Sequence, residues 1–93
     1  MIIDCHGHYT TAPSELEAWR KRQIAALDDP SRGPKRSELV IRDDQIRESL
    51  ENAQLRMQRE RGTDVTIFSP RASFMAHHIG NESTSREWSM LCN

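Results

Sequence analysis

The strongest constraint on the fold is the alternation of strand-like and helix-like segments along the chain. A short apolar strand is expected over residues 1–5. A second is expected over 64–70, where β-branched and aromatic residues precede Pro70. Apolar residues recur at helical spacing over 13–27 and 44–61, which predicts two helices between the strands. This order predicts a parallel α/β fold.

Helix and loop signals agree with this division. Pro13 suits the first turn of the first helix, Asp43 is a plausible cap for the second, and Gly62 stands where a C-cap is expected. Prolines, a glycine and mixed charge over 28–37 predict an exposed loop. Residues 71–83 are expected to form a second, longer loop.

A last helix is expected from residue 84, capped by Ser83, Thr84 or Ser85, and the sequence stops within it. Two parallel strands need cover on both faces and partners at their edges. A chain of 93 residues offers at most one small domain and a modest core. We therefore expect residues 1–93 to be the N-terminal piece of a larger protein.

The composition excludes several classes of partner. The net charge is −1, whereas proteins that bind nucleic acids or membrane surfaces are normally basic. No apolar run approaches the ~20 residues of a membrane span, and no signal-peptide pattern opens the chain. The two cysteines lie far apart, and Cys5 is expected to be a small buried strand residue. A reduced, cytoplasmic setting is the simplest interpretation.

The segment DCHGHYTTAP carries the clearest chemical signal. If residues 2–8 are extended, Asp4, His6 and His8 share one face of the strand. Neutral imidazole is a good zinc ligand, so the two histidines are candidate metal ligands. The alternative is a pair of ordinary polar residues that leave the strand. Asp4 either orients a histidine or bonds within the sheet, and Gly7 leaves the other face open, where a helix could pack closely.

The segments MIIDCHGHYTTAP and ERGTDVTIFSPRASFMAHHIG, with the tryptophan-bearing helices, carry a resemblance. They resemble the N-terminal part of the 4-oxalomesaconate hydratases, a family of the amidohydrolase superfamily. Its branch includes the aminocarboxymuconate-semialdehyde and resorcylate decarboxylases. The His-x-His marks the superfamily, whereas SPRASFMAHHIG favours the hydratases. The resemblance covers nearly all of this chain but only the first quarter or so of a family member.

The resemblance implies a distorted (β/α)8 barrel of the TIM type, of which residues 1–93 form the N-terminal portion of a single domain. It implies a divalent metal, with zinc the expected ion, bound by His6 and His8 at the carboxyl ends of the strands. The remaining ligands, a histidine and a carboxylate, come from later strands in the family. The general acid/base is also expected from outside this segment, so the 93-residue chain alone is expected to be inactive.

The implied reaction is hydration of a carbon–carbon double bond in an unsaturated oxo-tricarboxylate, 4-oxalomesaconate, during the catabolism of lignin-derived aromatics such as protocatechuate and gallate. A decarboxylase or hydrolase on the same scaffold is the alternative enzyme. A non-catalytic truncated remnant is the alternative from another class. A homo-oligomer is compatible with the sequence.

Further residues are candidates for the site. Arg71 directly follows the second strand, and its guanidinium could bind a substrate carboxylate bidentately. The alternative is a solvated loop arginine. Ser69 and Ser73 could add hydrogen bonds to the substrate. His77, chosen over His78 from the resemblance, is the candidate catalytic residue as a proton donor or substrate contact. Packing roles are expected for Trp19, Trp88 and Tyr9, and Tyr9 is also a pocket candidate.

Overall fold

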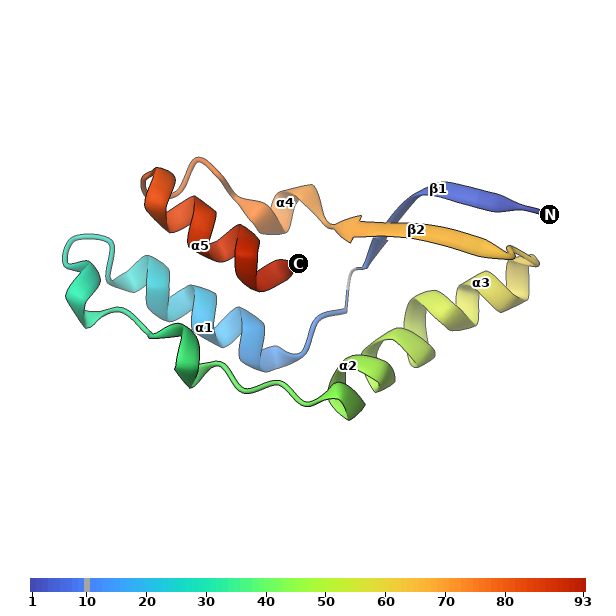
Figure 1. Ribbon diagram of the computed structural model, residues 1–93, viewed down its shortest axis with the longest axis horizontal. Coiled ribbons are helices and arrows are strands. Elements are labelled where there is room, and N and C mark those ends of the chain that lie inside the picture. Colours follow the sequence, from blue (N-terminus) through green and yellow to red (C-terminus); the bar gives the residue numbers. More distant parts are fainter. Residues whose placement is uncertain (10) are drawn as a thin grey trace.

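The chain forms an α/β unit with two parallel strands, as the sequence predicts (Figure 1). The computed structural model describes residues 1–9 and 11–93, and for residues 72 and 73 it describes the backbone alone. In chain order the elements are β1 (Ile3–Tyr9), α1 (Ser14–Ala25), η1 (Pro30–Arg32), η2 (Arg36–Glu38), α2 (Asp43–Leu50), η3 (Glu51–Leu55), α3 (Arg56–Arg61), β2 (Val65–Pro70), α4 (Ala72–Met75) and α5 (Glu82–Cys92).

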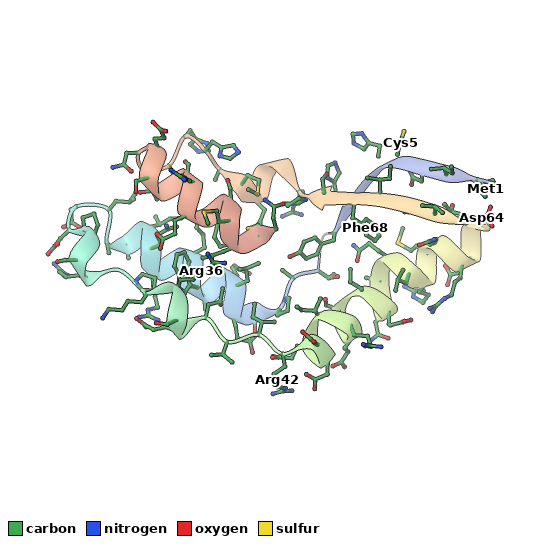
Figure 2. The ribbon with its side chains drawn as sticks, viewed as in Figure 1. Met1, Cys5, Arg36, Arg42, Asp64 and Phe68 are labelled. Atoms are coloured by element: carbon green, nitrogen blue, oxygen red, sulfur yellow. The ribbon has the colours of Figure 1, made fainter. Side chains whose placement is uncertain are left out.

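The two strands begin and end together. Asp64 holds the N-terminal ends of the two strands together, because its carboxylate accepts a hydrogen bond from the backbone N–H of Ile2 at 2.7 Å. Figure 2 shows Met1 and Asp64 side by side at this end of the sheet. β1 extends to Tyr9, four residues beyond the strand predicted over 1–5. The candidate histidines therefore lie inside the strand and not after it.

The hydrophobic core lies between α1 and α5 and not on the sheet. Leu16 and Trp19 of α1 pack against Trp88 and Cys92 of α5. The two indole rings stack with centroids 6.3 Å apart and planes 10° from parallel. Phe74 of α4 meets Trp88 edge-on at 5.1 Å. These contacts join α1, α4 and α5 into one helical cluster and confirm the packing roles expected of the tryptophans.

The helix predicted over 44–61 is present, but a π-helical turn interrupts it. α2, η3 and α3 follow one another without a break along one side of the sheet (Figure 1). Leu50 and Ala53, in the middle of the predicted apolar repeat, are half-buried. Ile46 and Met57 remain 42% and 39% exposed. Gly62 ends the helix with φ 67°, as predicted.

Three local predictions are wrong. Arg42 rather than Asp43 occupies the N-cap of α2, and its backbone N–H donates to Gln45 Oε1 at 3.0 Å. The loop predicted over 71–83 contains the short helix α4. Asn81 caps α5 instead of a serine or threonine, because its side-chain oxygen accepts from the backbone N–H of Thr84 at 3.0 Å.

The molecule is elongated, and one face of its sheet is bare. Its extents are 49 × 26 × 15 Å, and its radius of gyration is 15.3 Å, against about 12 Å for a compact domain of this length. Ile3 and Ile67 are 56% and 60% exposed on the uncovered face. Cys5 is also exposed, so its predicted burial is wrong, because no described element covers that face (Figure 2). Within the described residues, no helix is long and apolar enough to cross a membrane.

Candidate functional site

His6 and His8 converge near the carboxyl end of β1. Their Nε2 atoms are 3.1 Å apart, and the two rings stand nearly perpendicular, at 89°. His6 is exposed and His8 is half-buried. The structure therefore brings together the two residues that the sequence singled out as metal ligands.

A β-bulge produces this convergence. Asp4 pairs with Thr66 of β2, and His8 pairs with Ser69, so four steps on β1 match three on β2. Cys5 and His6 therefore share the single position opposite Ile67. The Asp4 carboxylate accepts a hydrogen bond from the backbone N–H of His6 at 3.0 Å and so bridges the bulge.

The bulge overturns one prediction about faces. Thr66 and Ser69 are three residues apart on β2, so their side chains point to opposite faces of the sheet. Their partners Asp4 and His8 consequently lie on opposite faces as well. Asp4 was predicted to share the histidine face. It instead supports the backbone of His6 from the other side.

Close packing leaves no room for a side chain at position 7, on the face of the sheet that carries the Thr66 side chain. A Cβ atom on Gly7 would overlap the Thr66 side chain and lie 2.8 Å from Phe68 Cδ1. The sequence predicted that a helix could pack closely here, whereas the crowding described at Gly7 comes from side chains of the neighbouring strand. The close packing at Gly7 brings β2 close to the histidine-bearing segment of β1.

The distance between the two histidines suits a shared metal ion. Two nitrogens that are each about 2.05 Å from a tetrahedral zinc ion lie about 3.3 Å apart, close to the observed 3.1 Å. The same separation also suits an N–H···N hydrogen bond in the absence of an ion. Within the described residues, no cluster of three or more His, Cys, Asp or Glu side chains could hold a metal. Two imidazole nitrogens are fewer than the four ligands that a zinc ion usually takes.

Ser69 adjoins His8 on the neighbouring strand. Its Oγ lies 3.1 Å from His8 Nδ1 and donates to the carbonyl oxygen of Gly7 at 3.4 Å. The sequence suggested a substrate contact for Ser69. The structure records a contact between Ser69 and the candidate ligand His8.

His6 and His8 line one pocket, together with Met57, Gln58 and Phe68. A second pocket opens where the strands end. It is lined by Tyr9, Pro70 and Arg71 together with Phe74 and Cys92. Burial raises the pKa of Tyr9, so its phenol stays protonated at neutral pH and can donate a hydrogen bond. Burial also raises the pKa of Cys92 to about 11, which keeps that thiol neutral and a poor metal ligand or nucleophile.

Arg71 is among the residues that line this pocket. It is exposed, and within the described residues its side chain makes no ion pair. Its backbone carbonyl accepts from Phe74 N–H at 2.9 Å, which fixes it as the first residue before α4. Because Ser69 pairs with His8, Arg71 lies only two residues beyond the level of the histidines.

The helical cluster holds α4 in place. Arg20 of α1 is 5% exposed, and its Nη2 donates to the carbonyl oxygen of Ala76, just after α4, at 3.3 Å. Its guanidinium also lies over the Trp88 ring, 5.0 Å from the centroid. Burial lowers the pKa of Arg20, although the group remains charged. No signal in the sequence pointed to this buried arginine.

The remaining candidates are not joined to the histidine pair. His77 is exposed between α4 and α5, and its backbone carbonyl accepts from Ser85 Oγ at 3.3 Å. Neither the pocket of His6 nor that of Arg71 includes His77. The side chain of Ser73 lies outside the described residues.

Two comparisons with known proteins bear on these residues. A solved structure, the 4-oxalomesaconate hydratase of Rhodopseudomonas palustris, matches the whole chain with 53% identity and a TM-score of 0.87. This chain is similar to a hydratase. A curated relative, the 2-keto-4-carboxy-3-hexenedioate hydratase of Sphingobium sp., is 52% identical over all 93 residues. No family model matches the chain.

The match covers part of each relative. The chain spans 27% of the length of the Sphingobium enzyme and 26% of the Rhodopseudomonas palustris structure. The two-stranded α/β arrangement thus resembles about a quarter of a hydratase. This proportion accords with the bare face of the two-stranded sheet.

Proposed function

We propose that this chain forms the N-terminal part of a metal-dependent hydratase. The enzyme would add water across a carbon–carbon double bond of 4-oxalomesaconate on a (β/α)8 barrel of the amidohydrolase type. The observation that carries the proposal is the 3.1 Å approach of His6 Nε2 and His8 Nε2, in a chain that matches a hydratase structure over its whole length. The edge at which the strands end is where such barrels place their active sites.

In this proposal His6 and His8 each donate one imidazole nitrogen to a divalent ion, with zinc the expected metal. Such an ion polarises the substrate or activates water. The chain's own contribution is to hold both nitrogens at a separation that suits one ion. Further ligands and a general acid/base would come from elsewhere in the barrel.

Arg71 is the proposed substrate-binding residue. Its guanidinium makes no described ion pair, lies at the strand ends and can donate a forked pair of hydrogen bonds to a carboxylate. The substrate is highly anionic, so such a partner would orient it beside the histidines. Ser73 and His77 are proposed as a further substrate contact and a proton donor, respectively.

A chimera tests the proposal. This chain replaces the matched 26% of the Rhodopseudomonas palustris enzyme, and the purified chimera is incubated with 4-oxalomesaconate. Hydration places OH on one carbon and H on the other, so the absorbance of the conjugated double bond should fall. The unmodified enzyme is the positive control, and the same enzyme lacking the segment is the negative control.

The outcomes separate the alternatives. Hydration by the chimera supports the proposal. A folded chimera that releases carbon dioxide instead would favour the decarboxylase alternative. A folded chimera that turns over no substrate would favour a non-catalytic remnant.

A further inference from the structure

The hydroxyl of Ser69 limits which nitrogen of His8 can carry a proton. Ser69 Oγ is 3.1 Å from His8 Nδ1 and donates to the carbonyl oxygen of Gly7 at 3.4 Å. A serine hydroxyl has one proton to give and lone pairs with which to accept. A carbonyl oxygen can only accept, so the proton given to Gly7 leaves Oγ to accept from His8.

This arrangement has a consequence at the other side of the imidazole ring. When Nδ1 carries the hydrogen and donates it to Ser69, Nε2 of His8 holds a free lone pair. That lone pair faces His6 Nε2 at 3.1 Å. The opposite tautomer would place a hydrogen on Nε2, where a metal ion needs a lone pair. Ligand histidines generally donate their second N–H to a neighbouring acceptor.

The two histidines differ in the hydrogen bonds that orient their rings. The ring contact described for His6 is with His8, and the hydrogen bond at its backbone comes from Asp4. His8 has the additional contact to β2 through Ser69. Since Ser69 and His8 pair in register and share a face, the contact is built into the sheet. His8 is therefore the histidine whose orientation depends on a side chain from another strand.

We propose that Ser69 is a positioning residue for the metal centre. Its Oγ accepts the Nδ1–H of His8, fixes that tautomer and holds the Nε2 lone pair toward an ion shared with His6. The inference rests on the proposed function, because it concerns the ion that the two histidines would bind. In this role Ser69 contacts the proposed metal ligand His8 and not the substrate.

A matched pair of variants tests the hydroxyl in the chimera. Ser69→Thr keeps the hydroxyl, whereas Ser69→Val has nearly the same shape without it. Both residues are suited to a strand. The zinc dissociation constant is measured by competition with a chromophoric chelator, and the KM for 4-oxalomesaconate is measured at saturating zinc. We expect Ser69→Val to weaken zinc binding about 10- to 100-fold, while Ser69→Thr stays near the parent and KM is unchanged in both.

Two results would overturn the assignment. Equal zinc affinity in the two variants would show that the hydroxyl does not support the ligand. A raised KM in Ser69→Val with unchanged zinc affinity would return Ser69 to the substrate. His8→Ala in the same assay distinguishes a wrong role for Ser69 from a wrong metal site. If His8→Ala keeps full zinc affinity, the proposed metal site is wrong, and so is the proposed role of Ser69.

Discussion

The two cysteines provide an internal test of the helical core. Cys92 is 8% exposed between α1 and α5, and burial raises its pKa to about 11. At pH 8 such a thiol is about 0.1% thiolate, against about 25% for an ordinary thiol of pKa about 8.5. A more basic thiolate is also a stronger nucleophile, and this raises its rate of alkylation roughly tenfold, which offsets part of the difference in ionisation. Ionisation alone should therefore slow alkylation of Cys92 about 20-fold, and burial should slow it further.

Cys5 is the comparison, because it is exposed on the bare face of the sheet. The chain is treated with iodoacetamide at pH 8, quenched at intervals and digested, and the labelled fraction of each cysteine peptide is measured by mass spectrometry. We expect Cys92 to react at least about 20-fold more slowly than Cys5. In concentrated guanidinium chloride the two rates should converge.

A core variant links this protection to packing. Trp88 is fully buried against Trp19 and Phe74. Trp88→Ala should therefore leave a cavity and lower the free energy of unfolding by about 3–5 kcal/mol. Cys92 should then react at nearly the rate of Cys5. Equal rates for the two cysteines in the parent chain under native conditions would refute the reasoning, since they would mean that α1 and α5 do not enclose Cys92.

Two substitutions test substrate binding by Arg71 and strand packing at Gly7. In the chimera, Arg71→Met should lower kcat/KM about 30- to 1000-fold with zinc retained, because loss of a forked carboxylate contact costs about 2–4 kcal/mol. Arg71→Lys should recover part of the loss, and kinetics of Arg71→Met within twofold of the parent would return Arg71 to the solvated surface. Gly7→Ala should destabilise the chimera by about 1–3 kcal/mol, measured by urea unfolding, because the new Cβ would crowd Thr66 and Phe68; an unchanged midpoint and slope would show that the strands separate easily there.

The features that local periodicity specifies could be predicted from the sequence. The helical spacing of Leu16 and Trp19 indicated α1 and its buried face. The β-branched residues before Pro70 indicated β2, and Gly62 marked the end of α3. The convergence of His6 and His8 was also predicted, although from a regular strand that the structure does not contain.

The features that depend on pairing between distant residues could not be predicted. The bulge at Cys5 and His6 depends on how β1 meets β2, and the strict alternation assumed for a single strand placed Asp4 on the wrong face. The burial of Arg20 depends on α4 and α5, more than fifty residues further along the chain. The expected burial of Cys5 failed because no described element covers that face of the sheet.

In the proposed function, His6 and His8 jointly hold the metal of a hydratase. The most direct measurement is the zinc content of the purified chimera and of its His6→Ala and His8→Ala variants, by inductively coupled plasma mass spectrometry after removal of loosely bound ions. We expect about one zinc per chain in the parent, with zinc and hydration both lost in each variant. Full zinc occupancy in both variants, with each still folded, would contradict it.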